Sequence, residues 1–133
     1  MTDRHRIIVE RYLEAWNATD AILRAKAVAS AWDLSGIYNS SMGNAKGHDD
    51  LVGLIAGFRA RFPGALFHLA GDIHNLDDII SVEWEILYPD CEAPAATGRD
   101  IIVVAANDRI QAVHSTFSGA INERVTDPGG QFR

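Results

Sequence analysis

Apolar residues recur at helical spacing along the first half of the chain and alternate with polar residues along the second half. The spacing predicts a first helix that ends near Asn17 and has two adjoining apolar stripes: Val9, Leu13 and Trp16, and Ile8, Tyr12 and Ala15. Thr19 or Asp20 is positioned to cap a second helix, whose inner stripe runs to Trp32. A third helix is expected after Gly47, with Pro63-Gly64 at its end.

The chain after Gly64 is expected to form strands. The clearest one spans residues 79–88, and its alternation places four apolar residues on one face: Ile80, Val82, Trp84 and Ile86. Similar segments occupy residues 65–73, 97–106 and 109–119, and a brief strand is expected around Ile37-Tyr38, before a loop that runs to Gly47. Three helices followed by four long antiparallel strands indicate an α+β fold, in which helices cover one face of a curved sheet.

Composition narrows the class of protein. The chain has 133 residues, 47% of them hydrophobic and 23% charged, which fits one globular domain. We assign residues 1–123 to this domain and residues 124–133 to a mobile tail. The formal charge of −6 argues against a nucleic-acid or anionic-membrane partner. No apolar run is long enough to span a membrane, so a cytoplasmic protein is expected.

Several forms of chemistry lack the residues they require. The chain has one cysteine, Cys91, which excludes an internal disulfide and a cysteine-rich zinc site. No His, Asp or Glu cluster has the spacing of metal ligands, and no glycine-rich nucleotide loop or nucleophile elbow is present. The sequence therefore predicts neither a metal nor an organic cofactor.

Several short motifs occur in a particular order along residues 5–120: Arg11-Tyr12-Leu13-Glu14-Ala15-Trp16-Asn17-Ala18-Thr19-Asp20, Gly36-Ile37-Tyr38, Gly47, Phe62-Pro63-Gly64, Val82-Glu83-Trp84, Gly98-Arg99-Asp100, and Asp108-Arg109-Ile110 leading to Phe117. Their order resembles the SnoaL-like branch of the nuclear transport factor 2-like superfamily. The resemblance implies a cone-shaped, cystatin-like α+β barrel, with three helices on the concave face of a strongly bent antiparallel sheet. Members include ketosteroid isomerase, polyketide cyclases, a dehydratase and an epoxide hydrolase, and also non-catalytic binding and association domains.

Asp100 is the most informative candidate for chemistry. It is the only charge at the head of an otherwise apolar strand segment, Ile101 to Ala106. A carboxyl group that faces an apolar cavity has its ionised form disfavoured, and it can then serve as an acid or a base near neutral pH. The resemblance agrees, because family enzymes often carry a functional acid on this strand. The alternative is an exposed carboxylate, or one that is paired with Arg99 or another arginine.

Tyr12 and His114 are two further catalytic candidates. By resemblance, Tyr12 occupies the place of an oxyanion-hole tyrosine, from which it could donate a hydrogen bond to an enolate; the alternative is a core tyrosine. His114 lies inside the last strand and would form an acid–base pair with a nearby carboxylate. Alternation groups His114 with Ala112 and Thr116 but leaves open whether this set faces the pocket or the outside of the sheet.

One departure from the family pattern bears on catalysis. Isomerase-type members place an Asp, followed by Pro, just after the short early strand, where this chain has Asn39 and Ser40. Neither side chain is a base near neutral pH. The remaining candidates for a pocket wall are aromatic and suit a flat, apolar ligand: Trp16, Tyr38, Phe58, Phe62, Trp84 and Phe117.

Two classes of function follow from these residues. One is a cofactor-free isomerase, cyclase or dehydratase that acts on a small apolar carbonyl or polycyclic substrate. In it, Asp100 would be the acid or base, Tyr12 or Tyr38 a hydrogen-bond donor, and His114 a second proton carrier. The other is a non-catalytic ligand-binding or association domain, whose polar groups pair with one another.

The expected assembly is a homodimer through the outer face of the sheet. Glu83, Arg99 and Ile101 are predicted to lie there, and family members commonly pair through this face. The alternative is a monomer that covers the face with its own residues Val125 to Arg133.

Overall fold

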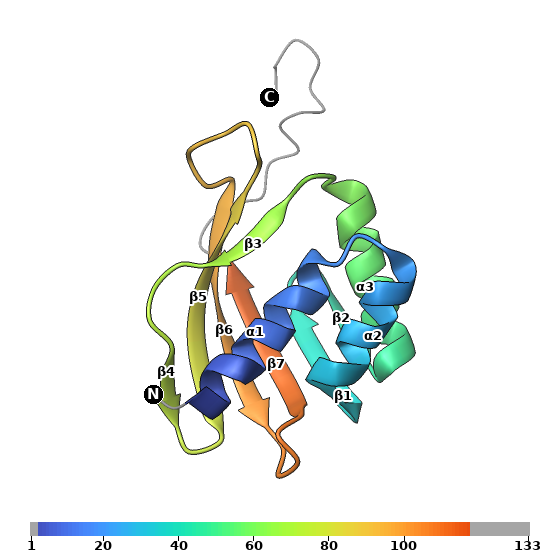
Figure 1. The fold of residues 1–133 in the computed structure, drawn as a ribbon, viewed down its shortest axis with the longest axis vertical. Helices are drawn as coiled ribbons and strands as arrows, with labels where there is room; N and C mark the ends of the chain where they lie inside the picture. Colours follow the sequence, from blue (N-terminus) through green and yellow to red (C-terminus); the bar gives the residue numbers. More distant parts are fainter. Residues whose placement is uncertain (1–2, 118–133) are drawn as a thin grey trace.

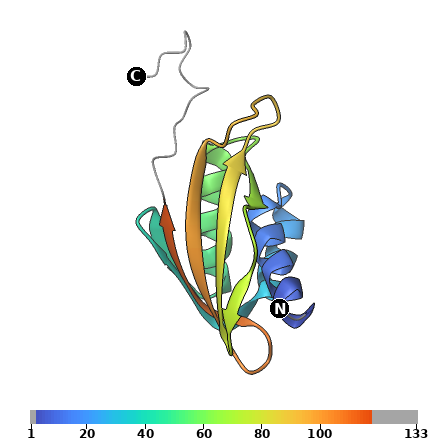
Figure 2. The same cartoon turned by 90° about the vertical axis from the view of Figure 1, so that its left-hand side faces the viewer.

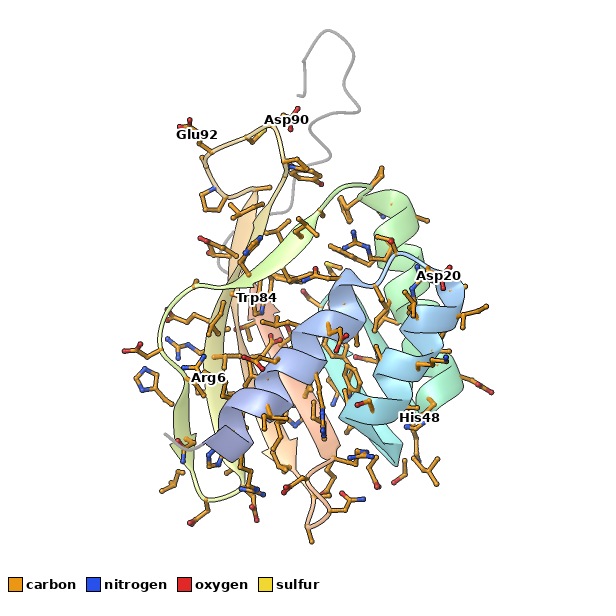
Figure 3. The ribbon with its side chains drawn as sticks, in the orientation of Figure 1. Arg6, Asp20, His48, Trp84, Asp90 and Glu92 are labelled. Carbon is orange, nitrogen blue, oxygen red and sulfur yellow. The ribbon has the colours of Figure 1, made fainter. Side chains whose placement is uncertain are left out.

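The computed structural model describes residues 3–117, which fold into three helices and a seven-stranded sheet (Figure 1). The helices are α1 (Asp3–Asn17), α2 (Ala21–Ala31) and α3 (His48–Arg61). The α+β class predicted from the sequence is confirmed, and so is the order of the three helices. Asp20 caps α2, since its carboxylate accepts a hydrogen bond of 2.9 Å from the Leu23 amide, and it lies at the start of that helix in Figure 3.

The sheet has the strand order β2-β1-β7-β6-β5-β3, with β4 also paired to β5. Its strands are β1 (Trp32–Ser40), β2 (Gly43–Lys46), β3 (Leu66–Leu69), β4 (His74–Leu76), β5 (Ile79–Leu87), β6 (Ala96–Val104) and β7 (Ile110–Phe117). All pairings are antiparallel except that of β1 with β7, which is parallel. The sheet is therefore mixed rather than antiparallel throughout, because β1 enters beside the last strand in the same direction.

Some early elements differ from the expectation. The brief strand around Ile37-Tyr38 is nine residues long, and the segment expected as a loop contains β2, because β1 is hydrogen-bonded on both sides. Trp32 does not continue α2 but begins β1, where it pairs with Ile110. The strand expected at residues 65–73 is shorter, and β4 forms a separate piece.

All three helices lie against the same face of the sheet (Figures 1 and 2). The helix α1 crosses in front of the central strands, and α3 packs on β1 and β2. The alternation predicted for residues 79–88 is confirmed, since the whole predicted set is buried on the covered face: Ile80, Val82, Trp84 and Ile86. The core therefore sits between this face and the helices. The strong bend expected of the sheet stays a prediction.

Two absences concern residues 3–117. No helix in this part of the chain is long and apolar enough to cross a membrane. Nor does it contain a group of three or more His, Cys, Asp or Glu side chains placed to hold a metal ion. The tail assigned to residues 124–133 lies outside the described residues.

Candidate functional site

A buried polar cluster joins α1 to the middle of the sheet. The Tyr12 hydroxyl of α1 donates a hydrogen bond to one carboxylate oxygen of Asp100 on β6, and the Trp84 indole N–H of β5 donates to the other at 2.8 Å. All three side chains are only 2% exposed. Trp84 extends from β5 toward the side of the sheet that α1 covers (Figure 3). The carboxylate is therefore held by two donors away from water.

Gly98 makes this arrangement possible. In the β5–β6 register Trp84 lies opposite Gly98, and Val82 lies opposite Asp100, so the indole must reach along β6 to meet the carboxylate. A Cβ atom added to Gly98 would lie 2.3 Å from Trp84 Cζ2 and 2.5 Å from the Thr116 carbonyl oxygen. Only glycine leaves room for the ring at this place.

Burial raises the pKa of Asp100 above its ordinary value, because removal from water disfavours the charged carboxylate. Neighbouring polar groups oppose this shift: first the Ser115 hydroxyl, then the donors Tyr12 and Trp84. Ser115 is paired with Asp100 across β6 and β7. Among the described residues, no cation forms an ion pair with Asp100, and Arg99 points to the other face, where it pairs with Glu83. Asp100 is thus a shielded acid without a counter-ion.

Two phenols next to this carboxyl group stay protonated at neutral pH. Burial and then the negative charge of Asp100 raise the pKa of Tyr12 well above its usual range. The same two causes raise the pKa of Tyr38 to about 12. Both hydroxyls are therefore hydrogen-bond donors rather than bases.

An aromatic pocket of about 450 Å³ adjoins this cluster, between α1, α3 and the β1–β2 hairpin. Its wall consists of Trp16, Tyr38, Met42, Gly53, Leu54, Gly57, Phe58, Arg61 and Phe62. Trp16 stacks at 5.2 Å from Tyr38 and contacts Phe58 edge-on at 5.7 Å. The Trp16 indole N–H is buried and makes no hydrogen bond of ordinary geometry with a described residue, although it lies close enough to the Tyr12 hydroxyl to oppose the rise in the pKa of that phenol. The pocket thus combines apolar walls with an unused donor.

Comparison with known proteins gives matches of structure only. No family model matches the sequence, and no curated protein matches it significantly. A solved structure of a candidate isomerase of the SnoaL-like family from Agrobacterium tumefaciens superposes with a TM-score of 0.84 and 28% identity, over 89% of this chain and all of that one. The chain has the SnoaL-like fold.

Two further structures support the fold at lower identity. A SnoaL-like protein of unknown function from Burkholderia thailandensis gives a TM-score of 0.71 at 13% identity, over 90% of this chain and 98% of that one. A hypothetical protein from Catenulispora acidiphila with a ketosteroid isomerase-like fold gives 0.67 at 13% identity, over 93% of each chain, and was solved in complex with trimethylamine. The resemblance inferred from the sequence motifs is confirmed at the level of the fold.

The structure places four of the six predicted aromatic wall residues in the pocket: Trp16, Tyr38, Phe58 and Phe62. The other two lie elsewhere. Trp84 is enclosed between Phe67 and Phe117, at ring distances of 5.2 and 5.3 Å, and holds Asp100 instead of lining the cavity. Phe117 borders a shallow polar hollow at the ends of β1 and β7.

His114 is not part of the Asp100 cluster. It is exposed beside Ile101 on the opposite face of the sheet, with its ring 3.5 Å from the Asn39 amide nitrogen. Ser115 takes the inward position in its place, because the alternation of β7 buries Val113 and Ser115. The predicted pairing of His114 with Asp100 is therefore wrong.

Neither residue at the position of the family's early carboxylate takes its place. Ser40 is used within the β1–β2 turn, where its hydroxyl donates to the Gly43 carbonyl and accepts from the Met42 amide. The Asn39 side chain lies on the outer face. Within residues 3–117, Asp100 is the only buried Asp or Glu.

Three residues near the site were not singled out from the sequence. Phe67 contacts Trp16 and Phe58, and it was missed because β3 is too short to show alternation. Ser115 could have been found once the inward face of its strand was known. Arg61, which also lines the pocket, follows Phe58 by one helical turn. This spacing is recognisable in the sequence, but by itself it does not predict a functional role.

Proposed function

We propose that this chain binds a small, mostly apolar molecule with a hydrogen-bond acceptor in the aromatic pocket. The observation that carries the proposal is the Trp16 indole N–H, a buried donor on the wall of a 450 Å³ cavity that makes no hydrogen bond within residues 3–117. Leaving such a donor unsatisfied costs about 1–3 kcal/mol. A ligand oxygen would recover that cost, and the rings around it would cover flat apolar surface.

Tyr38 gives the ligand site a second donor. It lines the pocket and also lies close enough to Asp100 for the carboxylate charge to raise its pKa to about 12. A phenol that stays protonated at neutral pH can donate a hydrogen bond to a carbonyl oxygen, particularly one that gains negative charge. A ketone or a related carbonyl compound is therefore the ligand class we favour.

Cofactor-free acid–base catalysis is the second candidate function. Asp100 supports it, because a carboxyl group with a raised pKa suits proton transfer near neutral pH. The Agrobacterium relative, a candidate isomerase, points the same way. In an isomerase, cyclase or dehydratase reaction, Tyr38 or Tyr12 would polarise the carbonyl and Asp100 would exchange the proton. We favour ligand binding over catalysis as the function, because Asp100 already accepts two protein hydrogen bonds and does not line the cavity.

A single probe tests both functions. We expect 2-tetralone, an apolar bicyclic ketone, to bind in an NMR titration, and Trp16→Phe and Tyr38→Phe each to weaken binding about tenfold by removing one donor. If the protein is catalytic, it will also accelerate deuterium uptake next to the carbonyl in D₂O. Asp100→Asn will then abolish that acceleration and leave binding within about twofold.

Trp32→Phe is the matched control for this experiment. It also removes a buried indole N–H without a described acceptor, but Trp32 does not line the pocket. Binding that falls as much in Trp32→Phe as in Trp16→Phe would refute the pocket. Binding without any deuterium uptake would leave the non-catalytic function.

We also propose a homodimer through the outer sheet face. This face carries the Glu83–Arg99 pair, Ser81 bonded to Arg99 at 3.0 Å, and the half-buried Ile101 and Val103. A mixed polar and apolar surface of this kind suits a self-complementary contact. The alternative, coverage by residues 125–133, involves residues outside the described part of the chain.

Light scattering at micromolar concentration tests the assembly. We expect twice the 14.5 kDa chain mass, and a shift to monomer in Ile101→Glu, which places a charge in the contact. A wild-type mass near 14.5 kDa at every concentration would rule out the dimer.

A further inference from the structure

A second pocket, of about 440 Å³, lies where the start of α2 meets the end of α3. Arg24 of α2 and Arg59 of α3 line it, together with Thr19, Ala56, Ala60 and the Pro63-Gly64 turn. It shares no lining residue with the aromatic pocket. The two cavities are therefore separate sites.

The two arginines of this pocket are buried, and no described carboxylate is their counter-ion. Arg24 is 9% exposed and Arg59 is 8% exposed, and neither forms an ion pair with a carboxylate among the described residues. Their mutual proximity matters as well: burial and then the charge of Arg24 lower the pKa of Arg59. Two like charges in one buried place are unfavourable unless an anion joins them.

Backbone carbonyl groups accept hydrogen bonds from only some of the N–H donors of Arg24 and Arg59. Arg24 donates to the carbonyl oxygens of Ala18 and Thr19 at 3.3 and 3.2 Å, and Arg59 donates through Nη1 to that of Trp16 at 3.2 Å. A guanidinium has five N–H donors, and the Nε of Arg59 is buried without an acceptor among the described residues. The described residues thus leave part of the donor capacity of the two guanidiniums unused.

Capping of α1 explains the presence of one cation but not of two. The end of a helix carries roughly half a negative charge, which a single guanidinium exceeds. None of the residues that line the pocket is acidic, although the chain as a whole has a net charge of −6. The pocket is therefore locally positive in a protein whose net charge is negative.

We propose that the pocket between Arg24 and Arg59 binds a small oxyanion, which is either a phosphate or a carboxylate group. Two arginines that converge from neighbouring helices present the forked donors that oxyanions prefer. The anion would complete the pairing of both guanidiniums. It would also fasten the start of α2 to the end of α3 and support the end of α1 next to Trp16.

Calorimetric titration with inorganic phosphate, at ionic strength held constant with sodium chloride, tests this site. We expect saturable binding that Arg24→Gln and Arg59→Gln each weaken at least tenfold, the effect of losing charge-assisted hydrogen bonds. Lys26→Gln is the matched control, because Lys26 is an exposed cation on the same helix and lies outside this pocket. A parallel titration with acetate separates the two chemistries: the anion that binds more tightly identifies the ligand group.

A further variant covers the risk that loss of an arginine unfolds the chain. Ala56→Glu keeps both arginines and places a carboxylate on the pocket wall, one helical turn before Arg59. We expect it to melt at a higher temperature than the wild type in phosphate-free buffer and to lose the phosphate response. The proposal fails if neither anion gives saturable binding, if Lys26→Gln loses as much affinity as the arginine variants, or if Ala56→Glu binds phosphate like the wild type.

Discussion

Gly98→Ala is expected to destabilise the protein by about 3 kcal/mol, the upper range for an overpacked core. The new methyl carbon would lie 2.3 Å from the Trp84 ring and 2.5 Å from a backbone oxygen of the neighbouring strand. The ring must move, and its N–H then leaves Asp100 with one donor fewer. Urea denaturation, followed by circular dichroism because the fluorescence of Trp84 itself is perturbed, measures the loss.

Gly57→Ala is the matched control for this prediction. It makes the same chemical change at an exposed position inside α3, where an added Cβ meets nothing within 4 Å. It is expected to stabilise the fold by about 0.5 kcal/mol, because alanine has less backbone freedom to lose. Equal effects of the two substitutions would contradict the role given to Gly98.

Asp100 is expected to make the wild type less stable, relative to Asp100→Asn, as the pH rises. The folded-state pKa is raised above the ordinary value of 3.8, so the folded protein binds this proton more tightly than the unfolded chain does. The free energy of unfolding then falls as the pH rises from about 3.8 through the raised pKa, and it levels off above it. The total change is about 1.4 kcal/mol for each unit by which folding raises the pKa.

Urea titrations of both proteins between pH 3 and pH 8 give this difference directly. The asparagine variant removes the ionisable group but keeps its size and one acceptor oxygen for Tyr12 or Trp84. Carbon-detected NMR of the Asp100 carboxyl group, a resonance that Asp100→Asn lacks, gives the folded-state pKa independently. A stability difference that grows in favour of the wild type with rising pH would contradict the direction of the shift.

The residues whose environment is set by local pattern were the ones the sequence could predict. The alternation around Trp84 specifies which face of β5 is buried. Asp100 is easily recognised in the sequence as a single carboxyl group at the head of an apolar strand segment. Asp20 was a candidate cap because its type and position meet a local geometric need. These features require no knowledge of distant partners.

The features that were missed depend on contacts between distant segments. The face of His114 depends on the pairing of β7 with β6, whose register shifts between Val103 and Val104, so that alternation counted along β7 alone leaves it open. The parallel pairing of β1 with β7 joins segments about 75 residues apart. The sequence likewise does not predict the arginine pocket, since Arg24 and Arg59 come together only when α2 packs on α3.

The hydrogen bonds to Asp100 also determine which pairing of β5 with β6 can exist. If β5 slipped by one residue, Trp84 would turn to the outer face, and the carboxyl group would lose its indole donor inside an apolar layer. A slip by two residues would restore the face but separate Trp84 from Gly98, the only glycine of β6. In both mispaired sheets a buried polar group lacks its hydrogen-bond partner, which raises the free energy of the folded state. Purely apolar side chains at these positions would not impose this penalty. The Asp100 carboxyl group thus specifies the register of β5 on β6, because it makes neighbouring registers unfavourable while the strands assemble.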